Sequence, residues 1–372
     1  MCLLTGSLVY CVLAMLGARS YLRAKAVPLE VWPPVTVMRP LAGAEDNTEA
    51  NLRSLFSQDY PDLEVLLSVH TPDDPAAAVA RRVMATFPGV RSRLVVAGIS
   101  PMPNAKVWSL RALMLEARHE NLLMSDSDVR LDPDCLRGVV EELSQPGVAL
   151  VTCPYRAVGG PKFWSRVEAL GLNTDFLAGM LTQRYLNGMD FAIGPTIATR
   201  QGELEAIGGL AHLQRYLAED FVMGNMMFER GRKVILSRHV VEHHIGNDDF
   251  LKNWRHRLRW ARSTRRSRPW GYVGELFTKP VALALFCCAA VPSLWPVLLL
   301  TVAVRALVAW NTAVRILKDP AIARYWWLLP VEDLATFATW ALGFFGKTIQ
   351  WRGRDLILAR DGSFEMPAPM VD

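Results

Sequence analysis

Two aspartates separated by one residue, Asp126 and Asp128, have the residue types and spacing that most clearly suggest chemistry in this chain of 372 residues. They follow residues 121–124, an apolar run with the length of a buried strand. Carboxylate oxygens suit Mg²⁺ and Mn²⁺, so two carboxylates at a strand end can hold a divalent cation together with a diphosphate. The alternative is that both acids only form a turn or cap the next helix.

A second acid pair, Glu219 and Asp220, precedes a helix-compatible stretch at residues 221–230. A carboxylate there can act as a general base that removes the proton of an acceptor hydroxyl. Taken alone, the pair fits a helix N-terminus better, because the helix dipole favours acids in the first turn.

His256, Arg259 and Trp260 lie in a strongly basic, helix-compatible stretch. Arginine can grip a diphosphate, and an indole ring can stack on a sugar or a base. The same composition is typical of a basic helix at a membrane surface, with Trp at the level of the headgroups. These residues alone support both interpretations equally.

The elements that must position these side chains alternate between short apolar runs and helical stretches. The predicted strands are residues 35–38, 64–69, 93–96, 121–124 and 148–151, and the predicted helices are residues 49–57, 75–85, 105–117 and 133–143. This alternation predicts an α/β fold with a mostly parallel sheet. Ligands of such sheets bind beyond the carboxyl ends of the strands, where Arg39, Asp74 and Asp126 stand. The first strand is not followed by G-x-G-x-x-G, which argues against a dinucleotide-dependent oxidoreductase.

Apolar segments stand at both ends of the chain. Residues 3–17 carry no charge and are followed by Arg19, Arg23 and Lys25, an order that predicts a signal anchor and not a cleaved signal peptide. Residues 281–304 and 326–345 are each long enough to cross a bilayer, although Glu332 and Asp333 interrupt the second.

The basic flanks of these segments predict their topology. Arginines precede the first C-terminal segment at residues 262–268 and follow the second at residues 352–360, so an even number of crossings is expected there. The N-terminus is then outside, and the middle of the chain and the tail are in the cytoplasm. Residues 305–318 have the spacing of an amphipathic helix.

Charge and cysteine usage narrow the partners. The net charge of +5 is concentrated in the arginines of residues 255–268, beside a predicted membrane segment. Anionic headgroups and phosphates are therefore expected as partners, and nucleic acid is not. The six cysteines form neither a disulfide framework nor a metal-binding pattern.

The order and spacing of all these motifs carry a resemblance. The chain resembles glycosyltransferases of the family 2 superfamily, which have three separated acids and a final (Q/R)-x-x-R-W. More narrowly, it is similar to the ceramide glucosyltransferase family, family 21, and to the related bacterial hopanoid N-acetylglucosaminyltransferases. The matching stretches run from about Val35 to Arg354 and include residues 38–43, 58–61, 65–69, 73–76, 104–106, 126–128, 208–209, 218–220 and 259–260.

The resemblance implies a GT-A fold and a role for each motif. It implies that Asp126 and Asp128 hold a Mg²⁺ or Mn²⁺ ion and the donor diphosphate, and that Asp220 is the catalytic base. It further implies that Asp74 contacts the nucleoside, that Lys106 lies near the donor, and that Arg259 and Trp260 close over the diphosphate. His256, at the first position of this motif, is also expected to bind the donor. It departs from the family pattern, since Gln or Arg usually fills this position; a His can still donate a hydrogen bond to a phosphate, but its charge depends on pH.

The domain boundaries and the function follow from the resemblance and the hydropathy together. The expected parts are an anchor at residues 1–25, a cytoplasmic GT-A domain at 34–250, a basic interfacial helix at 251–270, membrane and interfacial helices at 281–350 and a cytoplasmic tail at 351–372. The expected activity is inverting transfer of a hexose from a UDP-sugar to a lipid hydroxyl, from UDP-glucose to ceramide, at a bacterial inner membrane. The alternatives are a hopanoid N-acetylglucosaminyltransferase, a polysaccharide synthase and an inactive membrane-anchored binding protein.

Overall fold

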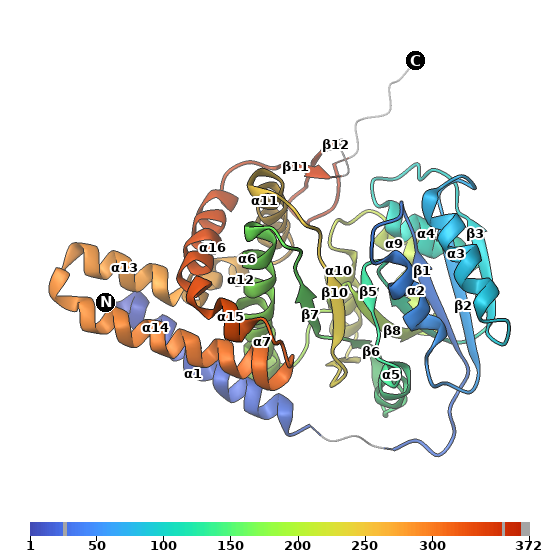
Figure 1. The fold of residues 1–372 in the computed structure, drawn as a ribbon, viewed down its shortest axis with the longest axis horizontal. Coiled ribbons are helices and arrows are strands. Elements are labelled where there is room, and N and C mark those ends of the chain that lie inside the picture. Colours follow the sequence, from blue (N-terminus) through green and yellow to red (C-terminus); the bar gives the residue numbers. More distant parts are fainter. Residues whose placement is uncertain (25–27, 352–353, 366–372) are drawn as a thin grey trace.

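The computed structural model describes residues 1–24, 28–351 and 354–365. An α/β domain fills one side of the molecule (Figure 1). A helical lobe, made by the start of the N-terminal helix and the C-terminal helices of residues 280–343, projects from the other side. The predicted flanking residues Lys25 and Arg352, and the tail from residue 366 onward, lie outside the described residues.

The α/β domain is built on a seven-stranded sheet in the order β3-β2-β1-β4-β8-β6-β9. Its strands are β1 (Val35–Pro40), β2 (Leu63–Val69), β3 (Arg91–Val96), β4 (Asn121–Ser125), β6 (Val148–Thr152), β8 (Thr196–Arg200) and β9 (Lys233–Leu236). β1 pairs in parallel with β2 and β4, and β8 runs antiparallel between β4 and β6. The predicted α/β class and all five predicted strands are confirmed.

β1 and β2 are mostly apolar, and the charged side chains within them, Arg39 and Glu64, are buried with hydrogen-bond partners. Every residue of β2 is buried, and so is every residue of β1 from Val35 to Arg39. Such burial on both faces is typical of parallel strands, which helices cover on both sides. β3, at the edge of the sheet, instead alternates between more and less exposed residues.

The predicted connecting helices are also present, with ends shifted by up to three residues. They are α2 (Thr48–Phe56), α3 (Pro75–Thr86), α4 (Ala105–Met114) and α5 (Cys135–Leu143). Side chains fix two of the starts. Asp74 accepts a hydrogen bond from the backbone N of Ala76 at 2.8 Å, and Asn104 accepts one from that of Val107 at 3.2 Å.

A second, three-stranded sheet has the order β5-β10-β7 and lies between the large sheet and the helical lobe (Figure 1). It consists of β5 (Val129–Arg130), β7 (Tyr155–Val158) and β10 (Val241–His244). Outside the N-terminal helix and the C-terminal apolar segments, the structure also has α6 (Phe163–Gly171), the π-helical η1 (Leu172–Phe176), α7 (Leu177–Asn187), α8 (Gln201–Ala206), α9 (Gly209–Leu213), α10 (Glu219–Glu229), α11 (Phe250–Ser267) and the hairpin of β11 (Thr348–Trp351) and β12 (Arg354–Ile357).

The C-terminal apolar segments are divided differently from the prediction. The structure has α12 (Pro269–Gly274), η2 (Glu275–Thr278), α13 (Pro280–Ala290), η3 (Pro292–Leu294), α14 (Trp295–Ala309), η4 (Trp310–Ile316), α15 (Ile322–Tyr325), η5 (Trp326–Leu328) and α16 (Leu329–Gly343). The expectation that residues 281–304 cross a bilayer as one segment is wrong, because the chain turns at η3 and α14 runs back beside α13 (Figure 1). Pro292 supplies the local reason, since proline cannot continue a helix.

Among the described residues, two helices are long and apolar enough to cross a membrane, α1 (Cys2–Leu22) and the stretch Pro292–Ile316. The bent pair Pro269–Thr278 and Pro280–Ala290 is a third candidate, with an angle of 62° between its halves. The predicted N-terminal span is thus a candidate by its length and composition. The predicted amphipathic helix at residues 305–318 proves to be the continuation of α14, and among the described residues the predicted span at 326–345 is not one of the candidates.

Ion pairs explain why two acids interrupt the last apolar segment. Glu332 accepts two hydrogen bonds from Arg257, at 2.9 and 2.8 Å, and Asp333 accepts one from Arg305 at 2.9 Å. Both acids are buried. A buried charge needs a partner, so the first pair holds α16 against α11 and the second holds α16 against α14.

Candidate active site

The site forms where β4 ends. Asp126 follows this strand, and its backbone N donates to the carbonyl O of Pro195 at 3.0 Å. Because β8 is antiparallel to β4, the start of β8 and the preceding Gly194 lie beside the end of β4. The D-x-D pair therefore faces a segment that stands about seventy residues away in the sequence.

Lys106, in the first turn of α4, joins two acidic motifs. Its Nζ lies 2.7 Å from Oδ1 of Asp126 and 3.2 Å from Oε1 of Glu219. Asn104 supports the arrangement by donating to Oε2 of Glu219 at 2.9 Å. Burial alone would lower the pKa of Lys106, but the surrounding carboxylates outweigh it and raise that pKa. Lys106 is therefore held as a cation.

Asp220 stands at the start of α10, next to this ion-pair cluster. A Cβ atom added to Gly194 would lie 3.0 Å from Oδ2 of Asp220 and 3.4 Å from Nζ of Lys106. Only glycine leaves the space between them open. Burial, with a smaller contribution from Glu219, raises the pKa of Asp220 to about 7. At neutral pH this carboxyl group can both accept and release a proton.

Glu219 and Asp220 lie in the first turn of α10, where the helix dipole favours acids, as the interpretation as a helix N-terminus expects. The N-cap residue itself is Ala218, and Glu219 is in addition bound to Lys106 and Asn104. The pair therefore combines a place at a helix start with contacts to the ion-pair cluster.

Asp128 is held by a histidine from the small sheet. The register of β10 against β5 places His243 opposite Val129, and Nε2 of His243 lies 3.1 Å from Oδ2 of Asp128. Burial would raise the pKa of Asp128, but His243 outweighs that effect and the pKa is lowered. The other oxygen, Oδ1, is buried and has no hydrogen-bond partner among the described residues.

The unpartnered Oδ1 of Asp128 shows whether a metal ion fits this site. A buried carboxylate oxygen without a donor fits a cation ligand. Within the part of the chain that the structure describes, no group of three or more His, Cys, Asp or Glu side chains is arranged to hold a metal. Asp126 and Asp128 thus fit a divalent cation only if other ligands, such as diphosphate oxygens, complete its shell.

Arg39 lies behind the two aspartates at the end of β1. Its guanidinium is fully buried and donates to Oγ of Ser125 at 2.7 Å and to the carbonyl O of Asn51 at 2.9 Å. Burial lowers the pKa of Arg39 to about 10, while Asp128 and Asp126 act in the opposite direction. Arg39 therefore supports the position of the D-x-D segment from inside the protein.

The family of the chain can now be stated. The chain matches the model of glycosyl transferase family 21 over residues 2–364. It belongs to this family. Ceramide glucosyltransferase 1 of Caenorhabditis elegans is 27% identical over 220 residues, which cover 59% of this chain and 47% of that protein. Ceramide glucosyltransferase 3 of the same organism is 28% identical over 214 residues, covering 56% and 45%. The chain spans about half the length of these curated relatives.

The fold is also found among solved structures. A mannosyltransferase from Pyrobaculum calidifontis, in complex with GDP-Man and Mn²⁺, superposes with a TM-score of 0.57 at 18% identity, over 92% of this chain and 97% of that one. At this identity the likeness concerns the fold alone. Together with the family match, it confirms the predicted GT-A fold.

The family 21 motif on α11 reaches the site through aromatic rings. The Trp260 ring lies 5.0 Å from His256 and 6.3 Å from Phe176, and Phe176 lies 5.7 Å from Tyr155. Tyr155 in turn lies 5.1 Å from His243, the partner of Asp128. The predicted residues on α11 and the D-x-D motif are thus joined by one row of packed rings.

The imidazole ring of His256 is held in place by a glutamate. Its Nδ1 lies 2.8 Å from Oε1 of the buried Glu168, which also accepts from Asn253. Arg259 follows on the same helix and is half-buried. Burial would raise the pKa of Glu168, but His256 and Arg257 outweigh it and keep that pKa low.

Asp74 lies at the same edge of the sheet, two strands away from Asp126. Its carboxylate caps α3 and also accepts from the backbone N of Gly43 at 3.0 Å. It thereby ties the loop after β1 to the loop after β2. The structure gives Asp74 a structural role and places it where a ligand could reach it.

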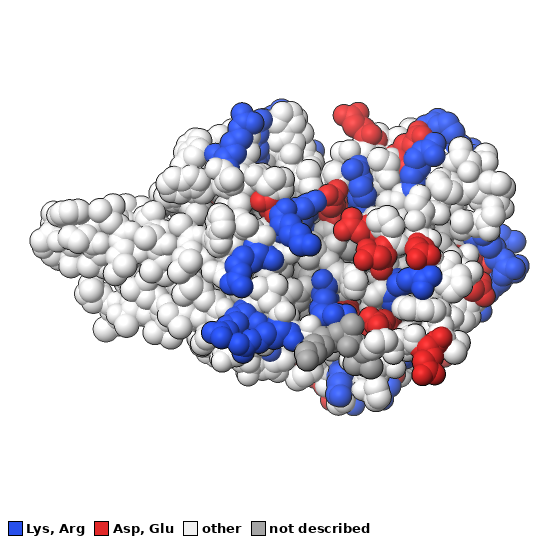
Figure 2. Space-filling model, turned by 60° about the horizontal axis from the view of Figure 1, so that its bottom comes forward, with Lys and Arg blue, Asp and Glu red and all other residues white. Residues whose placement is uncertain are grey.

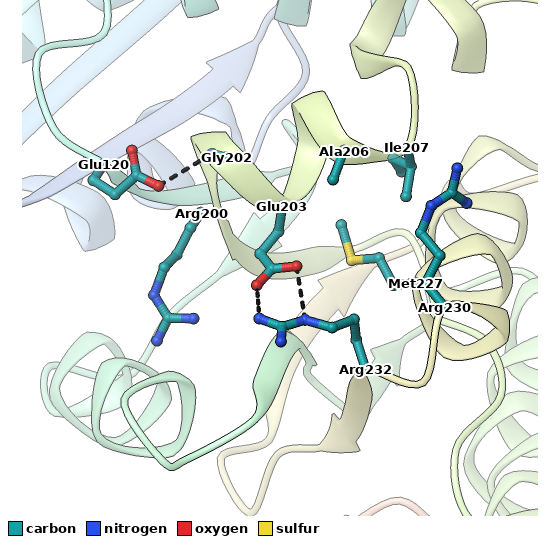
Figure 3. Close-up of a pocket in the computed structure, with 9 residues that line it drawn as sticks. All are labelled: Glu120, Arg200, Gly202, Glu203, Ala206, Ile207, Met227, Arg230 and Arg232. Atoms are coloured by element: carbon teal, nitrogen blue, oxygen red, sulfur yellow. Dashed lines mark hydrogen bonds and ion pairs between the residues drawn. The ribbon is translucent and has the colours of Figure 1, made fainter.

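A pocket of about 370 Å³ lies at the opposite end of β4 and β8. Figure 3 shows its lining, which includes Glu120, Arg200, Glu203 and Arg232. Arg232 is paired with Glu203, and Arg200 donates to the carbonyl O of Val148 at 2.9 Å. Since these charges are already satisfied and the pocket is remote from Asp126, it is not part of the candidate site.

Sequence reasoning brought Lys106, Asp126, Asp128 and Asp220 to one site, and the structure does place them together. It missed the contacts of Glu219 with Lys106, of His243 with Asp128 and of Glu168 with His256, and the hydrogen bond from Arg39 to Ser125. Glu219 gave a signal through its position beside Asp220, and Arg39 gave one through its place at a strand end. The contact of His243 with Asp128 depends on a strand pairing that no local pattern predicts.

Proposed function

We propose that this family 21 protein transfers glucose from UDP-glucose to ceramide, with its α/β domain on the cytoplasmic face of a bacterial inner membrane. The observation that carries the proposal is the closeness of Asp220 to the Lys106–Asp126 pair across Gly194. A proton acceptor and a donor-binding acid are then only a few ångströms apart, as an in-line displacement requires. The relatives named above as ceramide glucosyltransferases support the choice of substrates.

In the proposed mechanism Asp220 removes the proton from the acceptor hydroxyl. The hydroxyl oxygen forms a bond to the anomeric carbon while the bond from that carbon to the diphosphate oxygen breaks, and UDP leaves with the electron pair. The configuration at the anomeric carbon is inverted because the step is a single displacement. The pKa of about 7 suits this role, since a base acts best near the working pH.

The other site residues prepare the leaving group. Asp126 and Asp128 would hold a divalent cation, which when bound would neutralise charge that develops on the diphosphate. Lys106 is a fixed cation beside them, and Arg259 and Trp260 are proposed to cover the diphosphate from α11. Asp74 is proposed to contact the nucleoside, because it lies at the same edge of the sheet.

The experiment is a product analysis in membranes that contain the full chain. UDP-glucose and UDP-N-acetylglucosamine are each offered with ceramide and with bacteriohopanetetrol, and extracted lipids are identified by mass spectrometry. We expect glucosylceramide, and none of it with Asp220→Asn. N-acetylglucosaminyl hopanoid as the sole product would replace the assigned substrates. Absence of both glycolipids and of UDP release would overturn the assignment as an active enzyme.

A further inference from the structure

Three helices of the lobe, α1, α13 and α14, project from the α/β domain at the same level. Arg305 of α14 pairs with Asp333 and also donates to Oγ1 of Thr174 in η1 at 3.0 Å. Lys279, just before α13, pairs with Asp175 of η1. Residues 280–304 between these two cations contain no charged side chain. The two ion pairs therefore mark one plane from which α13 and α14 project.

The N-terminal helix crosses the same plane. Cys11 of α1 packs with Ala178 of α7 and Val308 of α14, whereas Leu4 packs with Leu283 and Ala284 of α13. Toward its other end, Tyr21 donates to the carbonyl O of Ser237 in the α/β domain at 2.7 Å. Oγ of Ser7 donates to the carbonyl O of Phe277, just before Lys279, so only the N-terminal turns of α1 belong to the lobe and its later part is packed on the catalytic domain.

The lengths of the two projecting C-terminal pieces agree with one another. Residues 280–290 of α13 and residues 295–305 of α14 each measure about 16 Å at 1.5 Å per residue, and the part of α1 that precedes Ser7 is shorter. A bilayer's hydrocarbon core is roughly 30 Å thick. The lobe therefore has the depth of about one leaflet.

The surface of the lobe is suited to hydrocarbon. Figure 2 shows it as an uncharged projection, with Lys and Arg gathered where it joins the α/β domain. Its exposed side chains include Phe286, Val291, Leu299 and Leu300. An apolar pocket of about 590 Å³ opens between α1, α13 and α16 and is lined by Leu4, Leu283, Phe286, Phe337 and Trp340, among others. Exposing this apolar surface to water would cost free energy.

Aromatic residues mark the level of the headgroups. Trp310, Trp326 and Trp327 are all more than half exposed and follow the projecting part of α14. The guanidinium of Arg324 lies 5.6 Å from the ring of Tyr325 in the same region. Trp, Tyr and Arg are enriched at membrane interfaces. They lie on the domain side of the plane set by Arg305.

We propose that the lobe made by the N-terminal turns of α1 and the α13–α14 hairpin inserts into a single leaflet, so that the chain enters and leaves the membrane on the catalytic side. The occupant of the apolar surface is the acyl-chain layer of that leaflet. This inference rests on the membrane location in the proposed function but differs from the topology that the basic flanks predict. In that topology α1 and the C-terminal segments cross the bilayer.

The test compares two exposed serines, Ser293 at the tip of the hairpin and Ser57 in the α/β domain. Each is changed to cysteine in a full chain whose Cys2, Cys287 and Cys288 are replaced by alanine. A charged maleimide is added to intact cells and to inverted inner-membrane vesicles. We expect Ser57→Cys to react from one side only, and Ser293→Cys from neither side until SDS is added. Reaction of Ser293→Cys on the side opposite to Ser57→Cys shows a crossing, and reaction on the same side shows no insertion. Either result overturns the proposal.

A matched pair of leucines tests the inserted surface. Leu299 of α14 is 59% exposed and Leu115, after α4, is 89% exposed. With purified protein and vesicles of phosphatidylethanolamine and phosphatidylglycerol, Leu299→Arg should reduce the bound fraction at least tenfold, whereas Leu115→Arg should leave it unchanged. Equal binding by all three proteins would contradict insertion of this face. UDP release measured in detergent reports on the proposed function separately, since it does not depend on the depth of the lobe.

Discussion

Nζ of Lys106 lies 2.7 Å from Oδ1 of Asp126. The acid that is proposed to face the donor diphosphate is therefore already paired with a cation of the protein. The same ammonium group lowers the pKa of Asp220 against the effect of burial. One side chain therefore connects the donor-binding acids with the proposed base. This connection makes the behaviour of a Lys106 variant specific enough to predict.

Lys106→Met should slow transfer and shift its pH dependence upward. Without the cation, the carboxylates of Asp126, Glu219 and Asp220 lie close together uncompensated, and the pKa of Asp220 should rise further above its value of about 7. The measurement is kcat/KM for the UDP-sugar as a function of pH. Lys233→Met, at an exposed position at the start of β9, is the matched control and should leave the profile unchanged. An unshifted profile for Lys106→Met would show that the two groups are not coupled.

The unmodified enzyme should become more active as the pH rises through about 7. Asp220 must be ionised to accept the hydroxyl proton, and burial raises its pKa to about 7, so the active form predominates only above that pH. The pH profile of kcat/KM at low donor concentration reports this group in the free enzyme. The residual activity of Asp220→Asn should lack the inflection. A profile that falls between pH 6 and 8 would assign the step to a general acid instead.

Asp220→Asn and Asp128→Asn should fail in different ways. Asp220→Asn keeps the size of the side chain and should leave UDP affinity almost unchanged, while transfer falls by about two to four orders of magnitude. Asp128→Asn weakens the proposed cation site, where Oδ1 is buried without a partner, so UDP binding in Mg²⁺ or Mn²⁺ should also weaken.

Titration calorimetry with UDP and metal separates the two variants, and a lipid-acceptor assay gives turnover. Chelator should abolish the activity of the unmodified enzyme, and added Mg²⁺ or Mn²⁺ should restore it. Loss of UDP binding in a folded Asp220→Asn equal to that in Asp128→Asn would falsify the assignment of Asp220 as base.

His256→Gln should retain most of the activity, whereas His256→Ala should not. A glutamine amide can donate to Glu168 in place of Nδ1, which lies 2.8 Å from Oε1, and Gln is usual at this position in the resembling families. Alanine leaves the buried Glu168 with one donor fewer, at a cost of about 1–3 kcal/mol. Turnover and the thermal midpoint of each variant check this. Equal loss in both variants would mean that the imidazole itself is required.

The predicted strands and helices of the α/β domain were recognisable because local physics decides them. β1, β2 and β4 are mostly apolar, as is typical of strands buried on both faces, and Asp74 and Asn104, which cap α3 and α4, directly precede the helices predicted at residues 75–85 and 105–117. The same pattern placed Asp126 and Asp128 at a strand end, where ligands of such sheets bind.

The sequence by itself thus determined the α/β class, the family and the acids that meet at the carboxyl ends of the strands. Only the tertiary structure decided which partner each acid has. Lys106 meets Glu219, Asp128 meets His243 and His256 meets Glu168 across 88 to 115 residues, through strand register and helix packing that no local propensity encodes. The membrane segments show the same division, because hydropathy reports the free energy of transfer for a segment but not the direction in which it runs. The turn at Pro292 and the ion pairs of Lys279 and Arg305 set that direction.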